Sequence, residues 1–155
     1  MRKKTIYLAS DHAGCELKAA VCAHLTVIAG YQIVDLGPDQ GDSVDYPDYG
    51  VKLAMALKDD IPACGIAICG SGIGISIAAN RFSWVRAALV STAEAASLSR
   101  QHNNANVLAL GERLIDRSLA LTCVEAFLDT AFEGGRHQRR VDKLTAIGND
   151  HLDLE

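Results

Sequence analysis

The chain has 155 residues and a net charge of −4, from 15 Lys and Arg against 19 Asp and Glu. Hydrophobic residues make up 49% and charged residues 22%, which is typical of one globular domain spanning residues 1–155 and excludes a disordered or fibrous chain. The negative charge offers no extended positive surface for a nucleic-acid backbone, so we expect no nucleic-acid partner.

The N-terminus gives no signal for export. The apolar run after the basic residues Arg2, Lys3 and Lys4 stops at Asp11, too early for a secretory signal. No stretch approaches the roughly 18 apolar residues that a membrane span needs. We therefore expect a cytoplasmic protein with no membrane partner. The five Cys show no Cys-x-x-Cys pair or metal-ligand spacing, so we expect reduced thiols, no disulfide framework and no metal site.

Short apolar or β-branched runs alternate with helical patterns along the chain, which is typical of an α/β protein whose parallel sheet is buried on both faces. Strands are predicted at residues 5–10, 32–35, 63–69, 87–90 and 107–110. The first helix carries an apolar stripe of Leu17, Val21, Leu25 and Ile28 and ends before Gly30. Further helices are predicted to end near residues 58, 80, 102 and 131, and a last, initially basic helix spans 136 to about 149.

Three of these helices have recognisable starts. Pro47 suits a first helical turn, Ser91 or Thr92 is expected to cap the fourth helix, and Asp116 is expected to cap the fifth. Helix starts of this kind place unpaired N–H groups next to the strands that precede them.

Polar side chains follow several predicted strands at the point where each strand ends. Asp11 and His12 follow the first strand, the loop after the second leads to Tyr46, Cys69 ends the third, and Arg113 follows the fifth. In an open parallel sheet, ligands bind beyond the carboxyl ends of the strands, where helix N-termini converge. The sequence therefore predicts one site at this edge.

A glycine-rich loop, with Gly70, Gly72 and Gly74 at alternate positions, follows the third strand. It allows close approach of backbone N–H groups to an anion. The spacing is Gly-x-Gly-x-Gly, Ile75 stands at the third glycine position of a dinucleotide fingerprint, and no P-loop lysine is present, so the match to a nucleotide site is weak. A tight strand-to-helix turn is the alternative interpretation.

Cys69 has two interpretations. A cysteine that ends a buried strand is more often a small core residue than a catalyst, but a helix N-terminus favours the thiolate, which serves as a base or nucleophile. His102 lies at a helix end, where an imidazolium complements the dipole, so a structural function is the default. Asp11 and His12 could equally cap a helix.

Arg136, Arg139 and Arg140 form a basic group at the start of the last helix. Such a group is usually a solvated face. Arginines at i and i+4 can also hold a phosphate monoester between their guanidinium groups.

Six motifs, in order along residues 4 to 147, resemble the ribose-5-phosphate isomerase B family, which also contains galactose-6-phosphate isomerase subunits. They are ASDHAG at 9–14, DYP at 45–47, ICGSGIGISIAAN at 68–80, SRQHN at 99–103, NVLA at 106–109 and EGGRH at 133–137. One branch of this family has a glutamate at the position of Ile75 and lacks the cysteine, so the chain resembles the cysteine branch.

The resemblance implies a three-layer αβα sandwich with a five-stranded, Rossmann-like parallel sheet. It implies a homodimer or tetramer with shared active sites, in which the C-terminal helix reaches a partner subunit. The implied reaction interconverts ribose 5-phosphate and ribulose 5-phosphate through an enediolate, with a small-molecule sugar phosphate as the partner and without a metal or cofactor.

The resemblance also implies a function for particular residues. Cys69 would move the proton between C1 and C2, Ser71 would move protons between the two oxygens, His102 of a neighbouring subunit would open the furanose ring, and Asp11 would contact sugar hydroxyls. The substrate-binding residues would be Gly70, Gly72 and Gly74 with Asn103 at the developing anion, Tyr46 at the pocket wall, and His12, Arg113, Arg136 and Arg140 around the phosphate.

The acidic loop 37–44 and the tail 151–155 depart from the family pattern. Because the loop lies beside the expected sugar site, an isomerase of a tetrose or hexose phosphate, such as erythrulose 4-phosphate or galactose 6-phosphate, is an alternative. A non-catalytic phosphosugar-binding module is a second alternative.

Overall fold

The computed structural model describes residues 3–148, and five parallel strands form one sheet in the order β2-β1-β3-β5-β4. The strands are β1 (Lys4–Ser10), β2 (Tyr31–Asp35), β3 (Cys64–Cys69), β4 (Ala87–Leu89) and β5 (Val107–Gly111). Every residue of β3 and β5 is buried, which agrees with their continuous apolar sequences and central positions. The predicted five-stranded parallel sheet is confirmed.

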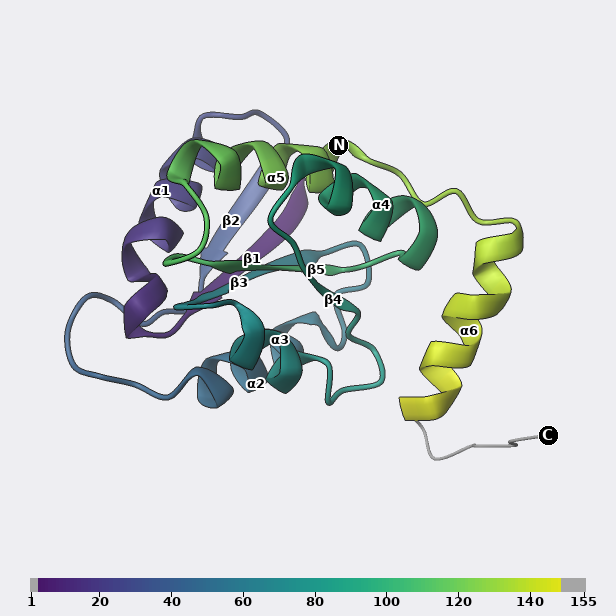
Figure 1. The fold of residues 1–155 in the computed structure, drawn as a ribbon, viewed down its shortest axis with the longest axis horizontal. Coiled ribbons are helices and arrows are strands. Elements are labelled where there is room, and N and C mark those ends of the chain that lie inside the picture. The colour runs from purple at the N-terminus through teal and green to yellow at the C-terminus, as the bar shows by residue number, and fades with distance from the viewer. Residues whose placement is uncertain (1–2, 149–155) are drawn as a thin grey trace.

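Helices cover both faces of the sheet (Figure 1). On one face lie α1 (Cys15–Thr26), α4 (Ala93–Asn103) and α5 (Arg117–Asp129), and on the other lie α2 (Tyr46–Leu57) and α3 (Ile73–Ala79). Two apolar clusters fill the interfaces: one includes Val21 and Phe127, and the other includes Leu53 and Ile75. The three-layer αβα architecture is therefore also confirmed.

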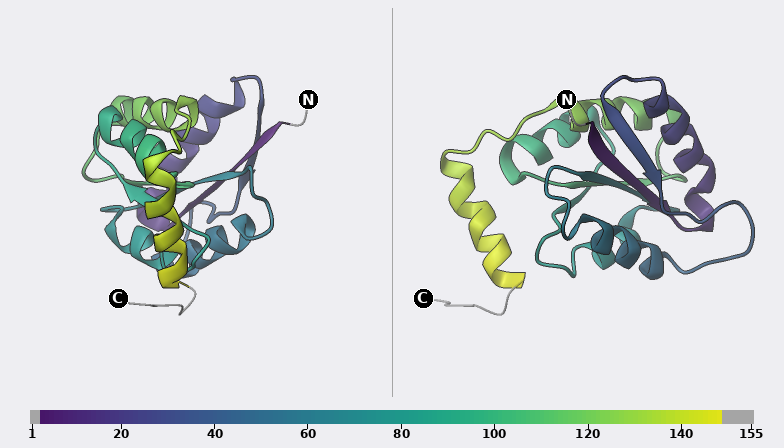
Figure 2. Two further views of the ribbon diagram at one scale, coloured as in Figure 1. Left: turned by 90° about the vertical axis from the view of Figure 1, so that its right-hand side faces the viewer. Right: turned by 180° about the vertical axis from the view of Figure 1, so that it is seen from behind.

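The last helix, α6 (Arg136–Gly148), stands at one end of the molecule and away from the sheet (Figures 1 and 2). It contacts α4. Val141 is buried against the body, but Leu144 is 47% and Ile147 54% exposed. This amphipathic helix therefore leaves much of its apolar face uncovered in a single chain.

The ends of several elements differ from the sequence prediction. The first helix ends at Thr26, so Ile28 lies outside it, although its side chain still packs on the core. The reason is the turn into β2, which Gly30 completes with φ of +105°. The fourth strand ends at Leu89, and the predicted end of the last helix at 149 lies outside the described residues.

Helix starts follow the prediction in part. Thr92 is the N-cap of α4, and its side chain accepts a hydrogen bond from the Ala95 N–H at 3.1 Å. Asp116 is the N-cap of α5, but its side chain makes no capping hydrogen bond. A short 3-10 turn, η1 (His12–Gly14), precedes α1.

The five cysteines are free. No helix within residues 3–148 is long and apolar enough to cross a membrane. The cytoplasmic location stays a prediction.

One ion pair ties α1 to the end of β2. Lys18 Nζ lies 2.6 Å and 2.8 Å from the two carboxylate oxygens of Asp35, and Asp35 Oδ1 also accepts the Gly37 N–H at 2.8 Å. The Lys18 side chain is 4% exposed, whereas that of Asp35 is 38% exposed. The buried Lys18 ammonium therefore needs its counter-charge more than the partly hydrated Asp35 carboxylate does.

We expect Asp35→Asn to lower the free energy of unfolding by about 3 kcal/mol, because it leaves a buried ammonium without a counter-charge. Lys18→Met should cost about 1 kcal/mol or less, because an apolar side chain of similar length fills the site and water still hydrates the Asp35 carboxylate. Urea unfolding at neutral pH measures both. A Lys18→Met variant as unstable as Asp35→Asn would contradict this assignment.

Candidate active site

The order of the strands reverses at β1, which lies between β2 and β3. The chain leaves β1 toward one side to form β2 and later returns to the other side to form β3. Such a reversal opens a crevice at the carboxyl ends of the two strands. Asp11 directly follows β1, and Cys69 ends β3, so both stand at this crevice.

A cavity of about 280 Å³ lies at this edge of the sheet. It gathers residues from the ends of three strands and from the start of α2. Its lining consists of Asp11, Tyr46, Cys69, Gly70, Ser71, Gly74, Arg113 and Leu114. Seven of these eight residues were predicted as site residues from the sequence.

The Cys69 side chain forms part of the wall of this cavity. The residue is 4% exposed, and its Sγ accepts the Gly72 N–H at 3.1 Å. Gly72 has φ of +75°, a left-handed conformation that turns its N–H back toward the end of β3. The turn therefore directs a main-chain N–H at the Cys69 sulfur. Cys69 thus belongs to the apolar core and to the cavity wall at once.

The glycine-rich loop also carries Ser71. Its Oγ accepts the Ile73 N–H at 3.2 Å, and the side chain lines the cavity. Gly72 itself is buried and does not line the cavity. Two main-chain N–H groups of this segment are therefore directed at side chains of the loop.

Asp11 caps a short helix, as one interpretation of the sequence expected, and it also lines the cavity. Its Oδ1 accepts the Gly14 N–H at 3.1 Å, which caps η1, and its own N–H donates to the Ile68 carbonyl at 3.1 Å. The residue is only 7% exposed, yet it lines the cavity. The cap fixes the carboxylate at the edge of the cavity.

Two glycines allow large side chains to approach the loop. A Cβ atom on Gly74 would lie 2.6 Å from the Tyr46 ring, and one on Gly70 would lie 3.0 Å from Nη1 of Arg113. The ring and the guanidinium therefore rest directly on the backbone of the loop. Arg113 forms no ion pair with a carboxylate of residues 3–148, so its charge is available to an anionic ligand.

His12 lies outside the lining of the cavity. It is exposed, and its Nδ1 accepts the Val44 N–H at 3.1 Å. Val44 ends the acidic loop 37–44 and stands two residues before Tyr46. His12 thus attaches this loop beside the cavity.

Four predicted site residues lie elsewhere: His102 and Asn103 at the end of α4, and Arg136 and Arg140 at the start of α6. The helix α4 runs back from the carboxyl end of β4 and finishes at the amino ends of the strands. There the Asn106 carbonyl accepts the Gly65 N–H at 2.8 Å. At about 3.3 Å per residue, the six residues of β3 separate this edge from Cys69 by roughly 16 Å. One chain does not bring the two groups together.

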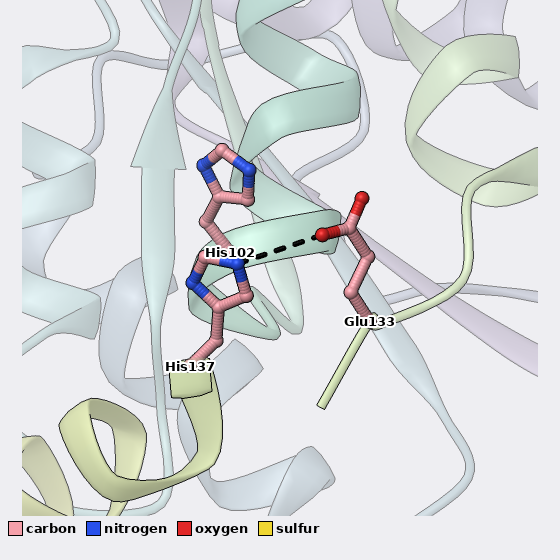
Figure 3. Close-up of side chains that lie close together, drawn as sticks. All are labelled: His102, Glu133 and His137. Carbon is pink, nitrogen blue, oxygen red and sulfur yellow. Dashed lines mark ion pairs between the residues drawn. The ribbon is translucent and has the colours of Figure 1, made fainter. Parts of the chain in front are cut away.

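The end of α4 is held by a histidine stack (Figure 3). The rings of His102 and His137 are nearly parallel, with centroids 4.4 Å apart and 14° between their planes. His137 Nε2 lies 3.5 Å from Glu133 Oε2, and the Glu133 N–H donates to the Gln101 carbonyl at 3.1 Å. Burial lowers the pKa of His137, and the nearby charges of His102 and Arg136 act in the same direction, while Glu133 opposes them. His137 therefore supports the His102 ring by stacking against it.

His102, Glu133 and His137 are also residue types that bind metal ions. One ligand atom from each of His102, Glu133 and His137 lies within 4.8 Å of the others. Stacked, nearly parallel rings direct their in-plane nitrogen lone pairs side by side and not toward one point, which disfavours tetrahedral coordination. The sequence-based expectation of no metal stays a prediction.

Sequence reasoning missed three residues of these groups, Leu114, Glu133 and His137. Leu114 lines the cavity and is 68% exposed, and its only sequence signal was its place directly after Arg113. His137 stood in the EGGRH motif, but no spacing rule places it under His102, because the two residues lie on different helices.

A thiol that accepts a main-chain N–H, beside an arginine without a counter-charge and at the switch point of a parallel sheet, defines an α/β enzyme for small anionic ligands. The family model described as Ribose/Galactose Isomerase matches residues 6–144. The chain belongs to the ribose/galactose isomerase family.

Individual relatives agree with this assignment. Ribose-5-phosphate isomerase B of Escherichia coli K12 is 46% identical over 144 residues, covering 93% of this chain and 96% of that protein. The structure of ribose-5-phosphate isomerase B from Clostridium thermocellum matches with a TM-score of 0.90 and 44% identity, over 96% of this chain and 99% of that one. The Mycoplasma genitalium enzyme with bound ribulose-5-phosphate matches with a TM-score of 0.91 and 42% identity, over 97% and 99% of the two chains.

The crowding around Gly72 gives a prediction. A Cβ atom there would lie 2.5 Å from Leu89 Cδ1 and 2.8 Å from the Leu110 carbonyl carbon, whereas one on Gly134, where φ is +65°, meets nothing within 4 Å. Both Gly72→Ala and Gly134→Ala should lose about 1 kcal/mol from the left-handed conformation. Gly72→Ala should lose roughly 1–3 kcal/mol more, because β5 and Leu89 must move. Equal losses in urea unfolding would show that the turn does not need glycine for space.

Proposed function

We propose that this chain is an aldose–ketose isomerase that interconverts ribose 5-phosphate and ribulose 5-phosphate, with residues 1–155 forming one sugar-phosphate isomerase domain. The observation that carries the proposal is the Cys69 sulfur, which accepts the Gly72 N–H at 3.1 Å in a cavity that also contains Arg113. Membership of the ribose/galactose isomerase family and relatives named ribose-5-phosphate isomerase B support it.

The proposed reaction is a proton transfer between neighbouring carbons. The Cys69 thiolate removes the proton from C2 of the open-chain aldose, the C–H electron pair forms the C1–C2 double bond, and O1 becomes an oxyanion. The same thiol returns the proton to C1, while Ser71 moves a proton from O2 toward O1. No oxidant is consumed, because one carbon is oxidised as its neighbour is reduced.

Main-chain donors of the Gly70–Gly74 segment stabilise the enediolate. A preorganised donor directed at a developing oxyanion contributes about 2.7–4 kcal/mol to the transition state. Gly70 and Gly74 have no side chain, so Arg113 and Tyr46 pack directly on the loop and line the same cavity as its backbone. Gly72 supports the base itself through its hydrogen bond to the sulfur.

Contacts with the parts of the sugar phosphate that do not react hold its reacting carbons in place. Arg113, exposed and without a carboxylate partner in the part of the chain that the structure describes, is suited to the phosphate. His12, which bonds the loop that leads to Tyr46, is proposed to join it. Asp11, held by its cap, is placed to accept hydrogen bonds from sugar hydroxyls, and Tyr46 forms the wall opposite Gly74.

A second copy of the chain completes the site. His102, Asn103, Arg136 and Arg140 sit at the opposite edge of the sheet from Cys69, so only a neighbouring subunit delivers them to the cavity. Arg136 and Arg140 are exposed at the start of α6, whose Leu144 and Ile147 are also uncovered. We infer a homodimer or tetramer in which α6 reaches the partner, His102 opens the furanose ring, Asn103 faces the enediolate, and the two arginines hold the phosphate.

Cys69→Ser should lower kcat for ketose formation from ribose 5-phosphate by at least about 100-fold, because a hydroxyl is a far weaker base. Substrate binding, measured by calorimetry, should persist. Cys22→Ser is the matched control: this half-buried thiol on α1 lies outside the cavity. Unchanged turnover in Cys69→Ser would remove Cys69 from the mechanism. Absence of ketose formation by the unmodified protein from pentose, tetrose and hexose phosphates would refute the isomerase and favour a binding module.

Sharing of the site is tested by mixing two inactive variants. In a hybrid of Cys69→Ala and His102→Ala chains, one of the two sites receives an intact Cys69 and an intact His102. After complete exchange of equal amounts, activity should return to about one quarter of the unmodified level. Native mass spectrometry verifies the exchange, and verified hybrids without activity would show that each site is built from one chain.

A further inference from the structure

A second cavity, of about 370 Å³, lies at the amino ends of the strands, at the opposite edge from Cys69. Its wall includes four cationic side chains, Lys4, Lys58, Arg86 and Arg100, and a single carboxylate, Asp60. Asp60 accepts a hydrogen bond from the Tyr7 hydroxyl at 3.1 Å. Among residues 3–148, none of the four cations forms an ion pair with a carboxylate. This excess of positive charge contrasts with the net charge of −4 of the chain.

One residue orients the two guanidinium groups. Asn104, which ends α4, has φ of +44° and is the one non-glycine residue of the described chain with a positive φ. Its carbonyl accepts Nε of Arg86 at 2.9 Å, and its side-chain oxygen accepts Nη1 of Arg100 at 3.1 Å. Asn tolerates this conformation better than most residues. The two arginines are therefore fixed by the protein and do not move freely as surface side chains do.

The two arginines differ in how many guanidinium N–H groups remain available to bind a ligand. Arg100 also bonds the carbonyls of Thr130 and Ala105, and its guanidinium carbon lies 5.5 Å from the centre of the Phe127 ring, so it serves mainly to close the end of α4. Arg86 uses only Nε, which leaves its two terminal amino groups for a ligand. Burial lowers the pKa of Arg86, and the nearby charge of Arg100 lowers it further. An anion at this point would relieve both effects.

We propose that this cavity is a second anion site, which binds inorganic phosphate or the phosphate group of a phosphomonoester. A phosphate oxygen pair matches the two terminal amino groups of an arginine, and the lysines supply further charge. Uncharged donors and acceptors also line the cavity, among them Asn106 and Thr145. The site does not depend on the proposed isomerase chemistry, since it shares no residue with the Cys69 cavity.

Trp84 makes this site directly observable. It is the only tryptophan of the chain, and it lines the cavity. Its indole N–H donates to the Ala54 carbonyl at 2.8 Å, and Lys58 Nζ lies 5.3 Å from the ring centre. An anion that draws Lys58 away from the ring changes the surroundings of the indole, so its fluorescence reports on this cavity and not on the Cys69 cavity.

The test is a titration of the whole protein with inorganic phosphate at constant ionic strength, followed by Trp84 emission. We expect a saturable change, with an affinity at least about tenfold weaker in Arg86→Met. Arg113→Met, which alters the other cavity, should leave the Trp84 titration unchanged. Because Arg86 also bonds Asn104, a second variant is needed, and Lys58 is an exposed residue of the same cavity. Lys58→Met should weaken phosphate binding several-fold without disturbing the core. Its affinity is measured by calorimetry, since Lys58 itself contributes to the Trp84 signal.

A titration of Arg113→Met with ribose 5-phosphate, compared with its titration with inorganic phosphate, identifies which anion the site binds. Tighter binding of the ester assigns the site to a phosphorylated metabolite, and tighter binding of the free ion assigns it to phosphate. The proposal is overturned if emission does not saturate, if chloride at equal ionic strength gives the same change, or if both Arg86→Met and Lys58→Met keep the affinity of the unmodified protein.

Discussion

The hydrogen bond from the Gly72 N–H to the Cys69 sulfur is the contact on which the rest of the site depends. It exists because the chain leaves β3 through a left-handed residue that packs against Leu89 and the backbone of β5. A residue with a side chain would separate this turn from β5, and the N–H would leave the sulfur. The contact at the Cys69 sulfur is thus set by the packing of the sheet, and the glycine is needed for space as well as for conformation.

Because of the direction of α4, the predicted site residues lie at two opposite edges of the sheet. A helix that follows a parallel strand must run back toward the amino ends, so residues at its end are carried away from the crevice. His102 and Asn103 are placed in this way, and α6 adds Arg136 and Arg140 beside them. The isomerase site that we propose would therefore require two chains, and the uncovered apolar side chains of α6 leave a surface for the second chain.

The sequence predicted the strands and their common edge, because buried parallel strands read as apolar runs and the polar residues follow them directly. It did not predict the partner of Cys69, since no local pattern encodes the direction of the Gly72 N–H. The predicted first helix was too long, because its apolar pattern included Ile28. Ile28 lies after the end of α1 but still packs on the core, and the sequence pattern does not distinguish these two cases. The sequence did not predict that His137 supports His102, because the stacked rings belong to two helices that are distant in the chain.

The residues at the end of α4 contact both the histidine stack and the arginines of the second cavity. Within three consecutive residues, His102 faces the stack with His137, Asn103 lies at the α6 side, and Asn104 orients Arg86 and Arg100. The positive φ of Asn104 is what allows its carbonyl and its side chain to serve two arginines at once. A group bound by Arg86 would act on the residue next to Asn103. If the second cavity binds an anion and a neighbouring subunit receives Asn103, as proposed, Asn104 is the residue that joins the two sites.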